Sequence, residues 1–116
     1  MNKFKELKVW QKSIQLVTTI YSQTSNFPKE EVYGITSQIR RCAVSIPSNV
    51  AEGAGRRTKK DFSHFLDIAK GSSFELETQL IISKELGFIE RIKFENLNSD
   101  LEEIQKMITG LQKSIK

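Results

Sequence analysis

The sequence is poor in the residues on which most catalytic and metal sites depend. Of its 116 residues, only one is a cysteine and one a histidine, Cys42 and His64. A single cysteine excludes an intrachain disulfide and fits a reducing compartment. Neither residue has a neighbour at metal-ligand spacing. We therefore expect no cofactor and no metal, with Cys42 a small core residue and His64 a partly exposed helix residue.

Long apolar runs and strand-like runs are also missing. No window approaches 18 consecutive apolar residues, so no membrane span is expected. The first residues, "MNKFKELKVWQ", contain no apolar region typical of a secretory signal. Runs rich in Val, Thr and Tyr are scarce, which disfavours a sheet. These absences predict a cytoplasmic, helical protein with no membrane partner.

What the sequence does contain is helical periodicity. Four helical segments are predicted at about residues 7–24, 29–53, 58–87 and 93–115, separated by short breaks. Short breaks favour antiparallel neighbours. The prediction is therefore an all-α fold: one domain over residues 1–116, a left-handed up-down-up-down four-helix bundle.

Apolar stripes define the expected faces of these helices. The fourth segment has the most regular stripe, with apolar residues alternating at three and four from Phe94 to Ile115. In the second segment the stripe comprises Ile35, Ile39, Cys42, Ile46 and Val50, and in the third it comprises Phe62, Phe65, Ala69, Ser72, Leu76, Leu80 and Ser83. In the first segment the main stripe comprises Leu7, Trp10, Ile14, Val17 and Tyr21.

Apolar residues outside these stripes indicate self-association. A four-helix monomer covers about one stripe per helix. The surplus residues are Val9, Leu16 and Ile20 in the first segment and Leu66, Ile68, Ile81 and Ile82 in the third. We expect these positions to contact other subunits of a homo-oligomer.

The stretch "SIPSNVAEGAGRRTKKDF", Ser45 to Phe62, admits several interpretations. Pro47 predicts a kink in the second helix, and Gly53 or Gly55 could end it in a left-handed conformation. "TKKD" resembles a capping box, in which Thr58 bonds the amide of Asp61 and Asp61 reaches back. The glycines could also form a phosphate cradle, but no strand precedes them and no Gly-Lys follows, which disfavours a nucleotide-hydrolysing loop. The free amides at the start of the third helix could still hold a backbone phosphate.

Catalysis finds little support in the same region. Ser45, Ser48, Ser72 and Ser73 have no obvious basic partner. Glu52 lies beside several cations, and an ion pair with Arg41, Arg56 or Arg57 explains it better than a catalytic role. We therefore expect no catalytic residues, no enzyme and no small-molecule substrate.

Positive charge is concentrated in one part of the chain. Between Arg40 and Lys60, six basic residues stand against one acidic residue, a local net charge of +5 in a chain of +4 overall. A local basic excess indicates a polyanion, a membrane surface or an acidic partner, and the alternative is a solvated surface without such a partner. With no base-reading array of side chains, binding would depend on backbone and shape. The candidate nucleic-acid-binding residues are Arg40, Arg41, Arg56, Arg57, Lys59 and Lys60.

Four segments resemble a known family: "LKVWQKSIQL", "FPKEEVYGITSQIRRCAVSIPSNVAEG", "DFSHFLDIAKGSSFELETQL" and "LGFI". They resemble the proteins encoded in intervening sequences of bacterial 23S ribosomal RNA genes and, more distantly, the accessory variability determinant of diversity-generating retroelements. The resemblance implies a four-helix bundle, a homopentameric ring and a basic surface for structured nucleic acid. It implies no catalytic residues. The family's motif falls on Gln38, Arg40, Arg41, Ser45, Pro47, Asn49, Glu52, Gly53, Phe62, Phe65, Ala69, Ser72 and Glu75.

The sequence is therefore compatible with two functions. The first is a non-enzymatic oligomeric protein that binds structured RNA, or DNA, through its basic segment. The second is a structural or adaptor bundle that binds a protein partner without nucleic acid.

Overall fold

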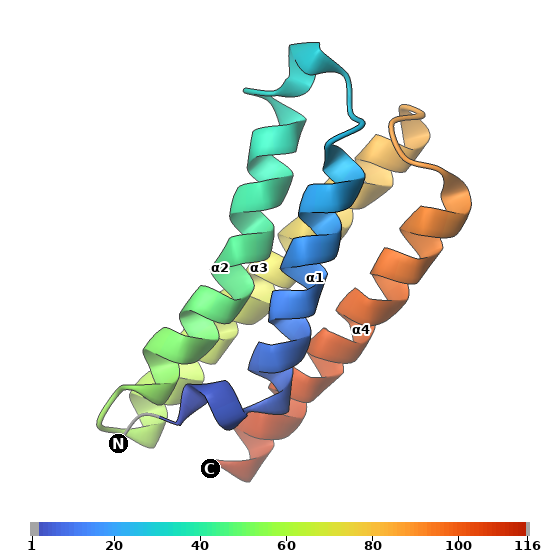
Figure 1. Cartoon of the computed structure of the whole chain (residues 1–116). Helices are drawn as coiled ribbons and strands as arrows, with labels where there is room; N and C mark the ends of the chain where they lie inside the picture. The colour runs from blue at the N-terminus through green and yellow to red at the C-terminus, as the bar shows by residue number, and fades with distance from the viewer. Residues whose placement is uncertain (1–2, 116) are drawn as a thin grey trace.

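The computed structural model describes residues 3–115 and contains four long helices in succession (Figure 1). These are α1 (Lys8–Thr24), α2 (Ile35–Ala54), α3 (Lys59–Glu85) and α4 (Arg91–Ser114), with short 3-10 turns η1 (Phe4–Glu6) and η2 (Lys29–Glu31). Residues 3–115 include no strand. The helices alternate in direction along a body of 43 × 24 × 20 Å. The predicted all-α four-helix bundle is confirmed.

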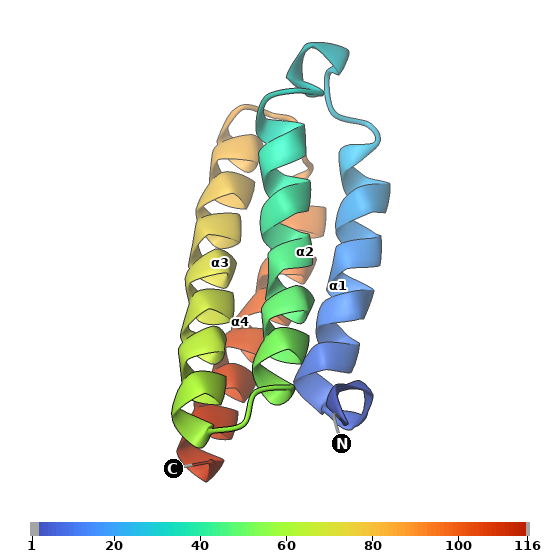
Figure 2. The ribbon, with the colours of Figure 1, turned by 90° about the vertical axis from the view of Figure 1, so that its left-hand side faces the viewer.

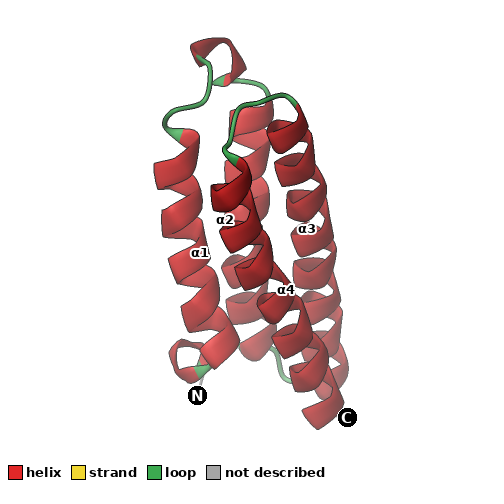
Figure 3. Ribbon diagram, turned by 90° about the vertical axis from the view of Figure 1, so that its right-hand side faces the viewer, coloured by secondary structure: helices red, strands yellow, loops and turns green. Residues whose placement is uncertain are grey.

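The helices form a square in which each contacts two neighbours. Helix α2 packs against α1 and α3, and α4 packs against α3 and α1. Two views at right angles to Figure 1 show the same order around the bundle (Figures 2 and 3). The face shared by α1 and α2 is therefore opposite the face shared by α3 and α4. Pro47 lies inside α2, which continues past it to Ala54, while the predicted kink and handedness stay predictions.

The buried stripes of α2 and α4 are those expected from the sequence. Ile39, Ile46 and Val50 of α2 are fully buried, and Cys42 is nearly so. In α4 the buried residues are Phe94, Leu97, Leu101, Ile104 and Ile108. Strict three-and-four spacing is the period of a helix face that packs on other helices, so both stripes could be read from the sequence.

The prediction for α1 was wrong about which stripe faces the core. The buried residues are Val9, Ser13, Leu16, Ile20 and Thr24, whereas Ile14 and Tyr21 are more than 40% exposed. Ser13 and Thr24 are tolerated inside because their hydroxyls donate to the carbonyls of Val9 (2.6 Å) and Ile20 (2.7 Å). These internal hydrogen bonds make two polar residues compatible with burial. Because the core-facing stripe contains polar residues, a search for apolar spacing does not identify it.

The surplus apolar residues therefore divide into two groups. Val9, Leu16, Ile20 and Leu66 belong to the chain's own core, so they are not available for subunit contacts. Ile68, Ile81 and Ile82 on α3 are about 40% exposed, as predicted for positions outside the core. The exposed stripe of α1 joins them as apolar surface that this chain leaves uncovered.

The connections between helices also correct three predictions. Helix α2 begins at Ile35 and not near Lys29, because residues 29–31 form the separate turn η2. Gly53 and Gly55 lack a left-handed conformation, which occurs at Gly87 (φ 78°) between α3 and α4. Thr58 caps α3 by accepting from the amide of Asp61 at 3.0 Å, but no return bond from the Asp61 side chain forms within residues 3–115.

Candidate nucleic-acid interface

The six candidate cations do not lie together: α2 separates them into two groups. Arg40 and Arg41 occupy the second turn of α2, whereas Arg56, Arg57, Lys59 and Lys60 surround the turn between α2 and α3. At 1.5 Å per residue, the helix between Arg40 and Ala54 separates the two groups by about 20 Å. We call the second group, Arg56, Arg57, Lys59 and Lys60, the basic corner.

Arg40 is engaged inside the protein. Its Nε donates to the Thr24 hydroxyl at 2.9 Å and its Nη2 to the Tyr21 carbonyl at 3.2 Å. Its guanidinium also lies 4.5 Å above the centroid of the Tyr21 ring, a cation–π distance. Arg40 therefore connects α2 to the end of α1. The neighbouring Arg41 is exposed, and its guanidinium donates a long hydrogen bond of 3.5 Å to the Ser37 hydroxyl.

The basic corner is open to solvent. Helix α2 ends at Ala54, and the amide of the next residue, Gly55, donates to the carbonyls of Ala51 and Glu52. All four cations that follow are exposed. Arg56 forms an ion pair with Glu52 at 2.9 Å and covers the Phe65 ring at 4.7 Å. The ion-pair interpretation of Glu52 is thus confirmed.

The other three cations of the corner have no ion-pair partner in the described part of the chain: Arg57, Lys59 and Lys60. Asp61 is the nearest acidic residue in sequence and occupies the first turn of α3, where a carboxylate is favoured by the helix dipole. Four cations and two carboxylates leave a net positive charge at this end of the bundle. Exposed, unpaired Arg and Lys side chains are the groups that contact phosphates.

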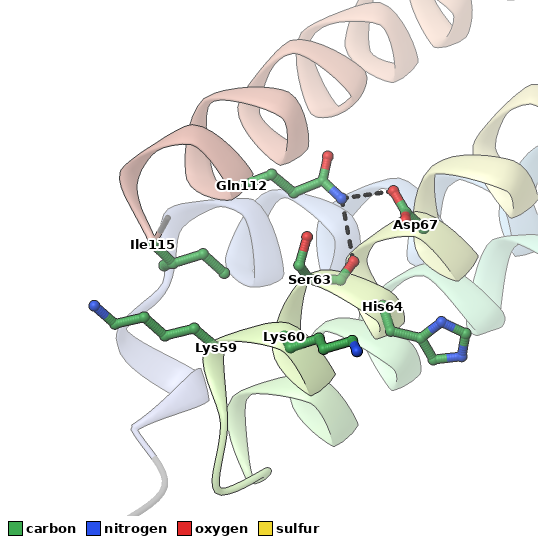
Figure 4. Close-up of a pocket in the computed structure, with 7 residues that line it drawn as sticks. All are labelled: Lys59, Lys60, Ser63, His64, Asp67, Gln112 and Ile115. Atoms are coloured by element: carbon green, nitrogen blue, oxygen red, sulfur yellow. Dashed lines mark hydrogen bonds between the residues drawn. The ribbon is translucent and has the colours of Figure 1, made fainter.

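Beside the basic corner lies a cleft between the start of α3 and the end of α4 (Figure 4). It has a volume of about 460 Å³ and is lined by Lys59, Lys60, Ser63, His64, Asp67, Gln112 and Ile115. The Gln112 amide donates to the Asp67 carboxylate at 2.7 Å and to the Ser63 carbonyl at 3.2 Å. Among the described residues that line the cleft, Asp67 is the only acidic one, and one of its carboxylate oxygens accepts the hydrogen bond from Gln112.

This cleft was not anticipated from the sequence. Ser63 and Asp67 are separated from Gln112 by more than forty residues, and only the antiparallel register of α3 and α4 brings them together. No local motif encodes the register of two helices. The apolar stripes of α3 and α4 are the sequence signal from which their register could be estimated.

The residues that suggested metal or nucleophile chemistry have structural surroundings instead. Residues 3–115 contain no group of three or more His, Cys, Asp and Glu side chains that could hold a metal ion. His64 is exposed and makes an edge contact with the Phe65 ring. Burial, followed by the charge of Glu75, raises the pKa of the Cys42 thiol to about 11. The thiol therefore stays protonated at neutral pH and is a poor nucleophile.

The segment that carries the family resemblance builds the contact between α2 and α3. The hydroxyls of Ser45 and Ser72 lie 2.8 Å apart, and the Asn49 amide donates to both the carbonyl and the hydroxyl of Ser45. At Gly53 a Cβ atom would stand 2.7 Å from the Cβ of Phe65, so only glycine allows this approach. These polar groups bond to one another, which explains them without a catalytic role.

The comparisons with known proteins agree with this architecture. Residues 5–110 match the family model of the 23S rRNA-intervening sequence protein. A crystal structure from Bacteroides thetaiotaomicron, described as a protein of unknown function from the S23 ribosomal protein family, is 28% identical with a TM-score of 0.82. The match covers 90% of this chain and 98% of that one.

Three negative findings accompany these similarities. No functionally curated protein matches this chain. None of the helices within residues 3–115 is long and apolar enough to cross a membrane. Neither the family nor the solved relative is described as an enzyme. On the match over residues 5–110, the chain belongs to the 23S rRNA-intervening sequence protein family.

Proposed function

We propose that this protein is a non-enzymatic, oligomeric bundle that binds structured RNA, or another nucleic acid, through its basic corner. The observation that carries the proposal is the set of three exposed cations without ion-pair partners in the described chain: Arg57, Lys59 and Lys60. Arg56 adds a fourth cation whose charge Glu52 partly offsets. A corner whose Arg and Lys side chains lie on a turn and on the first turn of α3 suits contacts to the phosphate backbone more than the reading of base edges.

Self-association supports this proposal because an oligomer carries one basic corner for each of its subunits. Apolar surface lies on two opposite faces of the bundle. On one face, a groove of about 300 Å³ between α1 and α2 is lined by Trp10, Ile14, Val17, Val44, Pro47, Ser48 and Ala51. On the opposite side, α3 exposes Phe74 and Ile81, with Phe74 beside α4. We call the first surface the α1/α2 groove.

Two different apolar surfaces on opposite faces favour a head-to-tail contact over a twofold one, because neither surface needs to match itself. Head-to-tail contacts close into rings when the rotation allows it. In a ring whose axis follows the bundles, every basic corner lies at the same rim, and the positive potentials add. The family resemblance implies that this ring is a homopentamer.

The adaptor function remains a second candidate because of the same groove. An exposed apolar groove between two helices can also receive an amphipathic helix of another protein. In that case the α1/α2 groove would bind the partner protein, and the basic corner would be a solvated surface.

A salt titration of binding to a structured RNA separates the two functions. Phosphate contacts predict a log–log slope of about −0.7 to −0.9 per contact. The double variant Arg57→Glu, Lys60→Glu should lower the affinity at least tenfold and flatten the slope. The matched control, Lys29→Glu with Arg91→Glu, makes the same change in net charge at the opposite end of the bundle and should alter affinity much less. A slope near zero, or equal losses in both variants, would contradict the proposal.

A further inference from the structure

A second cavity lies at the end of the bundle opposite the basic corner, where the chain passes from α1 to α2. Its volume is about 380 Å³, within the range of roughly 300–1,000 Å³ typical of small-molecule sites. It is lined by Thr24, Ser25, Phe27, Pro28, Lys29, Val32, Thr36 and Arg40. We call it the Arg40 cavity.

The Arg40 cavity contains a buried hydroxyl without a partner. Thr36 is only 5% exposed, and its Oγ1 makes no hydrogen bond within residues 3–115. A helical threonine commonly donates to the carbonyl one turn before it, as Thr24 at the end of α1 does to Ile20 at 2.7 Å. A buried hydroxyl without a hydrogen bond is unfavourable. A bound ligand that pairs with the Thr36 hydroxyl would explain why a threonine occupies this position.

Arg40 presents further unused donors one turn after Thr36, on the same face of α2. A guanidinium has five N–H groups, and its two recorded bonds go to Thr24 and to the Tyr21 carbonyl. Three N–H groups therefore have no acceptor in the described part of the chain. The bonds already made, with the Tyr21 ring beneath, hold the guanidinium in place, which lowers the entropic cost of binding.

The charge of the lining is of one sign. Lys29 contributes a second cation with no ion pair in the described chain, and none of the lining residues is acidic. Glu30 and Glu31 follow Lys29 in the chain but are not part of the lining, and the Glu31 carboxylate accepts from the Ile35 amide at 3.3 Å. Thr36 also belongs to the first turn of a 20-residue helix, whose dipole favours negative charge.

The rest of the lining is apolar. Phe27 is buried, Pro28 is partly buried, and Val32 is half exposed at the opening. A ligand that satisfies both parts of the cavity needs acceptor oxygens with negative charge at one end and an apolar group at the other.

From this geometry we propose that the Arg40 cavity binds a small organic oxyanion, a carboxylate or a phosphate carried on an apolar stem. The oxyanion accepts hydrogen bonds from the free guanidinium N–H groups of Arg40 and from the Thr36 hydroxyl, and Lys29 adds charge. The apolar stem lies against Phe27 and Pro28. This site is independent of the basic corner and of nucleic-acid binding.

The test is a titration of the full chain with benzoate and with phenyl phosphate, followed by amide and arginine Nε chemical shifts. Saturable shifts are expected at Val32, Thr36 and the Arg40 Nε, and the tighter of the two ligands identifies the oxyanion. Benzyl alcohol, which has the same ring without the charge, should bind far more weakly. Equal binding of benzyl alcohol, or no saturable shift with either anion, would overturn the proposal.

Variants distinguish a ligand site from a structural hydroxyl. Thr36→Val removes the unpaired hydroxyl at constant shape and should weaken anion binding about tenfold, the effect of one charge-assisted hydrogen bond. Its melting temperature should not fall, because no internal hydrogen bond is lost. The exposed Lys29→Gln should also weaken binding, and Thr78→Val on the surface of α3 should not. Unchanged affinity in both Thr36→Val and Lys29→Gln would refute the site.

Discussion

The two Arg-Arg pairs of this chain have the same sequence and different structural roles. Arg40 lies on the side of α2 that faces α1 and bonds to Thr24 and Tyr21, while Arg56 and Arg57 lie beyond the end of the helix. Arg40 thus contributes to the fold, and Arg57 is exposed and unpaired within residues 3–115. The difference shows that the position of an arginine on a helix, and not its charge, decides whether its whole side chain is free to contact a nucleic-acid backbone.

The largest effect is expected at Gly53, which holds the end of α2 against α3 and so fixes the corner that carries Arg56 and Arg57. In Gly53→Ala the new Cβ would meet the Phe65 Cβ at 2.7 Å and the Phe62 carbonyl at 3.2 Å. Overpacking of this kind costs about 1–3 kcal/mol. Denaturant unfolding should therefore show a clear loss of stability.

Gly71→Ala is the matched control for this substitution. It lies on the open face of α3, where a Cβ meets no atom within 4 Å. Replacing a glycine inside an exposed helix should raise stability by about 0.5–1 kcal/mol. If both variants were destabilised equally, close packing at Gly53 would not be the reason for its glycine.

A direct comparison of the two pairs uses Arg40→Met and Arg57→Met. Arg40→Met removes two hydrogen bonds and a cation–π contact at a partly buried position, so stability should fall by about 1–2 kcal/mol. Its affinity for structured RNA should hardly change. Arg57→Met should leave the unfolding free energy within about 0.5 kcal/mol and weaken RNA binding. Measuring both quantities on both variants tests the separation, and a stability loss in Arg57→Met would contradict it.

Much of the fold was predictable because helix periodicity is a local signal. The apolar spacing in α2 and α4 identified their buried faces, and Thr58 marked the start of α3. The α1 face was not predictable because Ser13 and Thr24 satisfy their hydroxyls within their own helix and so enter the core. Hydropathy alone ranks such residues as exposed, so it predicts that the more apolar stripe of Trp10 and Ile14 faces the core.

The candidate site was predictable only in part, for a related reason. Sequence proximity grouped Arg40 with Arg56 although most of the length of α2 lies between them, and it could not place Gln112 beside Asp67. Both errors concern the position of residues in three dimensions. The ion pair of Glu52 with Arg56, by contrast, spans four residues of the chain and is one of the three pairings predicted for Glu52 from the sequence.

The smallest effect is expected from Glu52→Gln, which tests the difference between Arg56 and Arg57. Arg56 is paired with Glu52 at 2.9 Å, and Arg57 has no such partner in the described chain. Because both side chains of the ion pair are about half exposed, its loss should change stability by less than about 1 kcal/mol. The amide no longer neutralises Arg56, so RNA affinity should rise severalfold at low salt. The salt slope should steepen by up to about 0.7–0.9, the value of one additional phosphate contact. An unchanged slope would mean that Arg56, held over the Phe65 ring, contributes to the packing of the corner and not to binding.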